Sequence, residues 1–181
     1  MNHIVFQSKC QGYSHIKSDL ECQDSTLVKK TEKYAIAVVA DGHGSASYFR
    51  SSRGSLFATE AAITAIEELL ETILSDKSNM DDFCASIDKH LIQLERSVIA
   101  RWHERVEDDY SKNPFLDSEI LKVDEKHKEK YLKGERIEAA YGSTLIAVAC
   151  TDAFWFGIHI GDGKCITCDY RGNFAEPIPW D

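Results

Sequence analysis

The chain has 181 residues, of which 43% are hydrophobic and 28% are charged, and only three are prolines. This length and balance suit one folded domain and exclude collagen-like, low-complexity and wholly disordered proteins. Thirty acidic residues against 21 Lys and Arg give a formal net charge of −9. Because such a surface repels phosphate backbones and anionic lipids, we expect neither nucleic acid nor a membrane surface as the main partner.

No segment carries an export signal or a membrane span. The first residues, 1–11 (MNHIVFQSKCQ), lack the apolar core of a secretory signal. No run reaches the roughly 18 apolar residues that a transmembrane helix needs. We therefore expect a cytoplasmic protein whose six cysteines are reduced.

The first half of the chain predicts one strand and two long helices. Residues 34–40 (YAIAVVA) are typical of a buried strand, which ends at the polar turn 41–44 (DGHG). Apolar residues then recur at three- and four-residue steps over 63–73 and again over 80–102, as on amphipathic helices. The polar residues between these segments indicate a break, with Asn79 as the cap of the second helix. The pair predicts an antiparallel helical hairpin.

The second half begins with a charged stretch and ends in strands. Residues 107–138 lose the apolar periodicity, and we expect a solvated, charged insert or flap within the domain. Three segments rich in β-branched and aromatic residues follow and are predicted strands: 142–150, 154–160 and 164–168. Turn signals separate or follow them, at 151–152, 162–163 and 171–173. This order of elements predicts an α+β fold with helices packed on a sheet face.

The turn after the first strand is the first candidate site. A carboxylate at the end of a buried strand, Asp41, followed by Gly42, offers a side-chain oxygen and a nearby carbonyl to a hard cation. The adjacent His43 could exchange a proton beside that cation. Taken alone, however, Asp-Gly is most often simply a turn.

Two further acidic positions lie at the ends of apolar strands. Asp24 precedes the first strand, where a lone carboxylate is ordinarily a cap or a surface residue. Asp162 lies between two glycines, a pattern typical of a type I′ hairpin turn. Together with Asp41, these residues form the pattern that a carboxylate site for several metal ions would have.

Five motifs in chain order share a resemblance to one family: Gly12-Tyr-Ser-His15, Cys22-Gln-Asp24, Ala40-Asp-Gly-His-Gly44, Tyr141-Gly-Ser-Thr-Leu145 and His159-Ile-Gly-Asp-Gly163. Taken together, they resemble the metal-dependent protein phosphatases of the protein phosphatase 2C type, the PPM family. The two N-terminal motifs are similar to the signature of a bacterial branch. The resemblance covers nearly the whole chain, as one domain over 1–181.

The resemblance implies a fold and a reaction. The fold is a four-layer α-β-β-α sandwich of two antiparallel sheets flanked by helical pairs. Two Mn²⁺ or Mg²⁺ ions, with an accessory third, bind at one end of it. The implied reaction is hydrolysis of phosphoserine and phosphothreonine in proteins by a metal-activated water, with substrates phosphorylated by a cognate kinase. Such ions lower the pKa of a shared water and neutralise the phosphoryl oxygens.

The resemblance also implies roles for single residues. Asp41 corresponds to a carboxylate that bridges two metal ions, and Gly42 offers its carbonyl to one of them. Asp24 matches an acidic residue of the metal centre that orients the attacking water. His43 matches the residue that protonates the leaving oxygen. Asp162 matches a carboxylate associated with the third metal ion.

Two departures from the family pattern lie near the N-terminus. Gln23 stands where many members have a ligating Glu, so one metal ion is expected to bind more weakly. Some relatives place an Arg before the aspartate for the substrate phosphate, whereas His15 and Lys17 are the nearest cations to Asp24 in this chain.

A third departure concerns the end of the chain, 177–181 (PIPWD). Family members contribute further metal-binding aspartates from a later segment. Only Asp169 and Asp181 follow Asp162 here, and neither lies in a matching motif. We therefore expect a domain that is incomplete at its C-terminus, with weak activity.

Two alternatives stay open at this point. One is a phosphatase-like fold that serves as a binding or regulatory module with little turnover. The other is a phosphatase for small phosphorylated metabolites.

Overall fold

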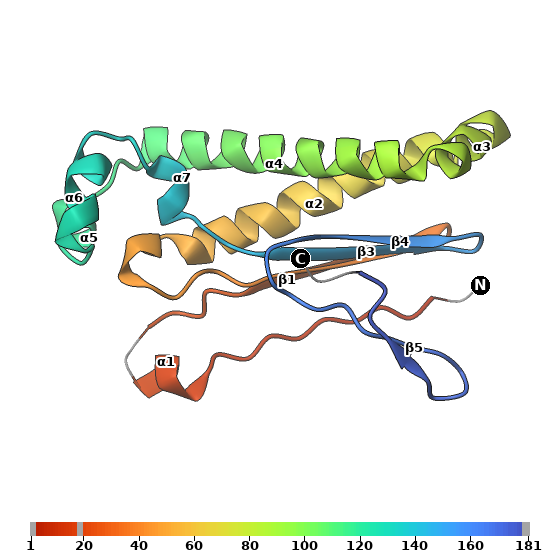
Figure 1. The fold of residues 1–181 in the computed structure, drawn as a ribbon, viewed down its shortest axis with the longest axis horizontal. Coiled ribbons are helices and arrows are strands. Elements are labelled where there is room, and N and C mark those ends of the chain that lie inside the picture. Colours follow the sequence, from red (N-terminus) through yellow and green to blue (C-terminus); the bar gives the residue numbers. More distant parts are fainter. Residues whose placement is uncertain (1–2, 18–19, 179–181) are drawn as a thin grey trace.

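A computed structural model describes residues 3–17 and 20–178 and shows one four-stranded antiparallel sheet covered by long helices (Figure 1). The strands of the sheet lie in the spatial order β1-β2-β3-β4: β1 (Ser25–Lys30), β2 (Tyr34–Ala40), β3 (Leu145–Thr151) and β4 (Trp155–Ile160). The predicted α+β class is confirmed.

The sheet pairs segments that lie far apart in the sequence. β2 lies between β1 and β3, with Tyr34 opposite Thr151 and Val39 opposite Ile146. The predicted strand 34–40 is β2. The predicted strand 154–160 is β4, except that β4 begins one residue later than predicted, at Trp155. β3 begins later than the predicted 142–150, because residues 142–144 bond to the turn after β2 instead of continuing the strand.

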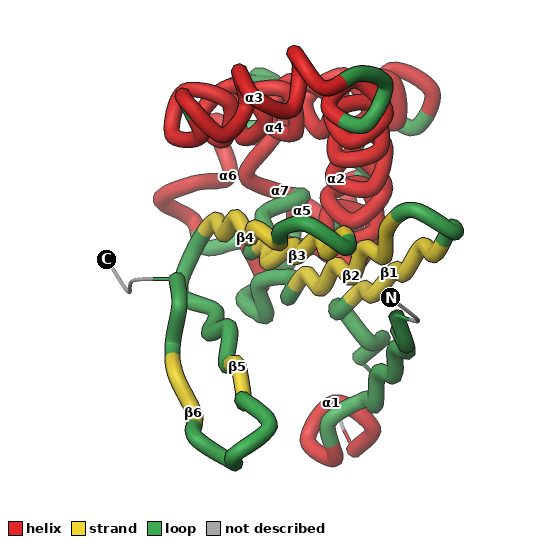
Figure 2. Tube along the Cα trace, turned by 90° about the vertical axis from the view of Figure 1, so that its right-hand side faces the viewer, coloured by secondary structure: helices red, strands yellow, loops and turns green. Residues whose placement is uncertain are grey.

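The last predicted strand, 164–168, is wrong as a member of this sheet. Only β5 (Thr167–Cys168) forms within it, and β5 pairs with β6 (Phe174–Ala175) in a separate ribbon on the side away from the long helices (Figure 2). Residues 162–163 therefore close no hairpin on β4, because Gly161, at φ 97°, directs the chain away from the sheet. The predicted turn at 171–173 is confirmed, with Gly172 at φ 84°.

Two antiparallel helices, α2 (Ser51–Ile73) and α4 (Ile87–Lys112), lie along the sheet as the predicted hairpin (Figure 1). α2 packs directly on β1, β2 and β3. The shared core includes large aliphatic side chains from both helices and the sheet: Ile36, Val38, Ile66, Leu70, Leu94, Val98 and Leu145. Burial of this seam supplies the hydrophobic free energy that holds the helices on the sheet.

The connection between the two helices corrects one prediction. A separate helix, α3 (Lys77–Ala85), begins at Asp76, whose carboxylate accepts from Ser78 N at 2.5 Å. Asp76 rather than Asn79 is the cap, because the extended backbone at Asp76 aims its side chain at the first helical turn. Asn79 lies inside the helix and donates to the carbonyl of Thr72 at 3.0 Å. A break at Ser86 then separates α3 from α4.

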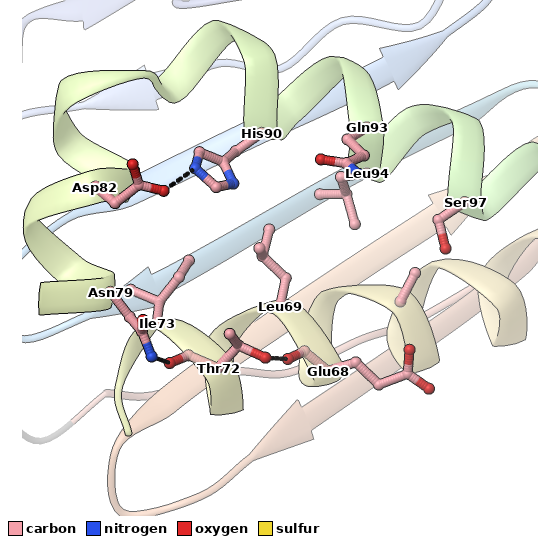
Figure 3. A pocket seen from close by; sticks show the side chains of 11 residues that line it. Glu68, Leu69, Thr72, Ile73, Asn79, Asp82, His90, Gln93, Leu94 and Ser97 are labelled. Carbon is pink, nitrogen blue, oxygen red and sulfur yellow. Dashed lines mark hydrogen bonds and ion pairs between the residues drawn. The ribbon is translucent and has the colours of Figure 1, made fainter. Parts of the chain in front are cut away.

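The three helices leave an open groove of about 290 Å³ near α3 (Figure 3). Leu69, Ile73 and Leu94 form its apolar floor, and His90 lies 3.1 Å from a carboxylate oxygen of Asp82 at its rim. The pair is partly solvent-exposed, so it contributes little to stability.

The charged stretch 107–138 has a core of its own. After α4 the chain forms three short helices: α5 (Asp117–Ile120), α6 (Glu125–Leu132) and α7 (Ile137–Ala140). A second buried apolar cluster holds them against the end of α4: Val106, Ile120, Val123, Tyr131, Ala140 and Tyr141. The segment is charged as expected, yet its inner side is packed.

Different elements cover the two faces of the main sheet. The long helices cover one face, while the N-terminal segment with α1 (Tyr13–Lys17) and the β5–β6 ribbon lie on the other side (Figure 2). The four-layer arrangement with a second large sheet stays a prediction. Within the described parts of the chain, no helix has the length and apolar character to span a membrane.

The close approach of α2 to residue 141 gives a test of this packing. A Cβ added at Gly54 would lie 1.7 Å from the carbonyl oxygen of Tyr141. We expect Gly54→Ala to lower the free energy of unfolding by about 3 kcal/mol, through overpacking against backbone. Intrinsic helix propensity alone would change it by about 1 kcal/mol in the opposite direction.

Urea denaturation monitored by circular dichroism measures this difference. Gly44→Ala is the control, because the nearest atom to its added Cβ is 3.7 Å away. A Gly54→Ala protein as stable as the parent would contradict the packing described for α2.

Candidate functional site

The turn after β2 is fixed by the segment before β3. The carbonyl of Asp41 accepts from Thr144 N at 2.8 Å, and Asp41 N donates to the Thr144 hydroxyl at 3.2 Å. His43 N donates to the carbonyl of Gly142 at 3.1 Å, and Gly42 forms an isolated β-bridge with Ser143. Two of the sequence motifs therefore meet at the end of the sheet.

Gly42 lies where three stretches of backbone come together. A Cβ added there would lie 2.5 Å from the carbonyl oxygen of Gln23 and 2.8 Å from that of Ser51. The carbonyl of Gln23 also accepts from the Ser55 hydroxyl at 2.5 Å. Only glycine fits this position, and the fit brings the segment before β1 next to the turn after β2.

The three predicted carboxylates line one cavity. Asp24, Asp41 and Asp162 come from three separate segments, before β1, after β2 and after β4. They surround an open cavity of about 560 Å³. The side chain of Thr144, which bonds to the Asp41 backbone, lines the same cavity.

Burial and neighbouring carboxylates both disfavour the charged form of Asp41. Partial burial raises the pKa of Asp41 above its usual range, and a hydrogen bond with the Asp24 carboxyl and the charge of Asp24 raise it further. Asp162 adds to the rise, while the neighbouring His43 lowers the pKa. A cation between the carboxylates would remove this repulsion.

The oxygen atoms at this place suit a hard dication. Outside the lining of this cavity, near Gly44, the buried side-chain Oε1 of Gln23 has no hydrogen-bond partner within the described residues. Carboxylate, amide and carbonyl oxygens are the ligands that Mg²⁺ and similar ions prefer. Among the residues that the structure describes, no three His, Cys, Asp or Glu side chains stand close enough together to hold a metal ion.

His43 faces a different hollow. Its ring packs against the ring of Tyr48, with centroids 4.6 Å apart and planes at 57°. With Trp102 and His103 it lines a mainly apolar cavity of about 210 Å³. Thr144 lines both cavities, so it forms the wall between them.

The sequence pattern did not single out Lys9. Its ammonium donates to the carbonyl of Asp24 at 3.1 Å, and its side chain lines the acidic cavity. His15 and Lys17, which the sequence offered as the nearest cations, lie in α1 and are not among the residues that line this cavity. Only the position of Lys9 upstream of Asp24 could have suggested it.

The later aspartates have a simpler explanation. Asp169 Oδ1 accepts from the backbone N of Arg171 and of Asn173, at 2.8 and 2.9 Å, so it shapes the turn between β5 and β6. Asp181 lies outside the described residues.

Comparison with known proteins identifies one family. A family model described as "Protein phosphatase 2C" matches residues 11–179, a range that includes all the candidate residues but not Lys9. No curated protein gives a significant match to the chain.

Removal of one carboxylate tests the repulsion in the acidic cavity. The pKa of Asp41 is raised in the folded protein, so the unfolded chain ionises at lower pH. The folded state therefore loses stability as the pH rises through the unfolded pKa of about 3.9. We expect Asp41→Asn to raise the Tm of the metal-free protein by about 1–3 °C at pH 7 and to lose this advantage near pH 3.

Differential scanning fluorimetry in EDTA measures both values. Asp169→Asn is the control with the opposite sign, because hydrogen bonds lower the pKa of Asp169 and its charge therefore stabilises the fold at neutral pH. A lower Tm for Asp41→Asn than for the parent at pH 7 would show that the carboxylates do not repel one another.

Proposed function

The chain belongs to the protein phosphatase 2C family, and from that premise we propose that it hydrolyses phosphoserine and phosphothreonine in proteins. The proposed site is the acidic cavity. The observation that carries the proposal is the convergence of Asp24, Asp41 and Asp162, from three separate segments, around that cavity.

We assign the metal-holding role to oxygens of this cavity. The family is generally metal-dependent, and Asp24, Asp41, Asp162 and the carbonyl of Gly42 would hold Mn²⁺ or Mg²⁺. Such ions, when bound, lower the pKa of a water and neutralise phosphoryl oxygens. The three carboxylates around the cavity and the raised pKa of Asp41 support a cation at this place.

The remaining steps fall to side chains of the chain itself. Asp24 would orient the attacking water and accept its proton. Lys9, a cation in an otherwise acidic cavity, would pair with the phosphate and hold it for in-line attack. His43 would donate a proton to the leaving serine or threonine oxygen. Thr144, bonded to both backbone groups of Asp41, would keep that carboxylate in place.

The proposed substrates are cytoplasmic proteins phosphorylated by a cognate kinase. The formal charge of −9 opposes the approach of a phosphorylated, anionic segment. Binding would then depend on the metal ions and on Lys9, so affinity should fall when the metal is removed.

One observation favours a second candidate. Within the described residues no three acidic, His or Cys side chains are assembled for a metal ion. That arrangement would also suit a phosphatase-like module that binds phosphorylated proteins with little turnover. Turnover of phosphopeptides by the purified chain with saturating Mn²⁺ separates the two, and sugar phosphates as substrates test for a metabolite phosphatase.

Loss of the central carboxylate should abolish catalysis. Asp41→Asn removes one charge at almost constant volume, so the fold is kept while metal affinity falls. We expect Mn²⁺-dependent release of phosphate from a phosphoserine peptide to drop to background, as measured by a colorimetric phosphate assay. Asp169→Asn, outside the cavity, should retain parental turnover, and near-parental turnover by Asp41→Asn would refute the assignment.

A leaving-group test addresses His43. If His43 is the general acid, His43→Ala should slow hydrolysis of a phosphoserine peptide by about 10²–10⁴-fold. An aryl phosphate, whose leaving group needs little protonation, should lose much less. His103→Ala is the matched control, because His103 lines the same apolar cavity and has no assigned role. Equal losses on both substrates would indicate that His43 is structural.

A further inference from the structure

The charged insert contacts the segment that follows the candidate turn. A short 3-10 helix, η1 (Ala46–Tyr48), lies between His43 and α2. Tyr131 of α6 is only 1% exposed, and its hydroxyl donates to the carbonyl of Ser47 at 2.7 Å. This hydrogen bond joins the middle of the insert to the middle of η1.

Arg50 fastens the same region to the start of the insert. Its side chain is 5% exposed, and its Nε and Nη2 each donate to the Glu119 carboxylate at 2.9 Å. Nη1 donates to the carbonyl of Asn113 at 2.6 Å, and Nη2 to that of Pro114 at 3.1 Å. Such a buried, bidentate pair is costly to break, so the position of the insert relative to residue 50 is firmly set.

Aromatic rings continue the connection. Phe49 packs against Phe115 and Tyr131, with ring centroids 4.9 and 5.5 Å apart. Its neighbour Tyr48 packs against His43 at 4.6 Å. Ser47 and Phe49, the residues before and after Tyr48, are therefore both held by the insert.

His43 has little else to orient its ring. In the described part of the chain no hydrogen bond reaches the imidazole, although its backbone N–H is bonded to Gly142. A Cβ added at Gly142 would lie 2.7 Å from His43 Cδ2 and 3.0 Å from Tyr48 Cδ1, so both rings rest on this glycine. Ring packing between Gly142 and Tyr48 thus decides where the imidazole points.

We infer that Tyr131 and Tyr48 are positioning residues for His43, and that the charged insert acts on the site through them. The Tyr131 hydroxyl holds the carbonyl of Ser47, the residue before Tyr48, and the Tyr48 ring packs against the imidazole of His43. This inference rests on the proposed role of His43 as general acid, for which a small displacement lowers the rate strongly.

Tyr131→Phe is the primary variant, because it removes one hydroxyl and keeps the ring. Tyr34→Phe is the matched control. Tyr34 is also buried, at 4% exposure, and its hydroxyl donates to Glu67 at 3.1 Å, in a contact between β2 and α2 that involves neither η1 nor the insert. Tyr48→Leu, which removes the ring against His43, is the second test variant.

The first readout is independent of activity. NMR spectra of the metal-free protein at fixed pH report the imidazole resonances of His43, assigned by their loss in His43→Gln. We expect these resonances to shift in Tyr131→Phe and more in Tyr48→Leu, and to stay unchanged in Tyr34→Phe. Unchanged resonances in both test variants, with native circular dichroism, would overturn the inference.

The second readout is a kinetic split. For a phosphoserine peptide we expect kcat to fall about 5-fold in Tyr131→Phe, the equivalent of one hydrogen bond, and about 10-fold or more in Tyr48→Leu. An aryl phosphate should lose less than about 2-fold, because its leaving group does not need the proton. Equal losses on both substrates would overturn the inference. If the parent chain releases no phosphate, the proposed function fails, and the His43 resonances alone decide the positioning.

Discussion

The site depends on the contact between the turn after β2 and the segment before β3. Two backbone hydrogen bonds, one hydroxyl and one bridge join 41–43 to 142–144, and Gly42 admits the Gln23 carbonyl from a third segment. The pairing of β1 with β2, with Ser25 opposite Ala40, brings Asp24 next to Asp41, and the contact with 142–144 fixes the turn that follows. The sheet therefore positions the residues of the site, and the close approach of the three segments requires glycine at position 42.

The acidic cavity groups side chains of like charge, which is electrostatically unfavourable. Three carboxylates lie around one cavity, and partial burial together with the neighbouring Asp24 and Asp162 raises the pKa of Asp41. Natural sequences depart from local consistency mainly at functional sites. Lys9 is a cation among the residues that line the same cavity, where its ammonium donates to the carbonyl of Asp24.

The sequence predicted the parts of the fold that depend on periodicity. β2, β4 and the α2–α4 hairpin follow from apolar spacing, and the family motifs singled out Asp24, Asp41 and Asp162, which line one cavity. Pattern alone could not show which segments pair. The strand at 164–168 looked like another member of the sheet, yet its neighbour in space is β6.

Sequence patterns also could not predict which side chains make long-range contacts. Asn79 and Asp76 are both good caps by composition, and only the extended backbone at Asp76 decides between them. The stretch 107–138 looked solvated because its charges outnumber its apolar residues, although Tyr131 and Ile120 are buried. Lys9 enters the cavity through chain geometry that no local motif encodes.

The pairing of β2 with β3 has a consequence for the order of folding. Residues 34–40 and 145–151 form the centre of the sheet, so both long helices and the insert must be synthesised before it can close. Contacts of such high sequence separation form slowly, because a long loop must be ordered first. Asp24 and Asp41 flank the local β1–β2 hairpin, whereas Asp162, which follows β4, can join them only after the long-range pairing of β2 with β3 has formed.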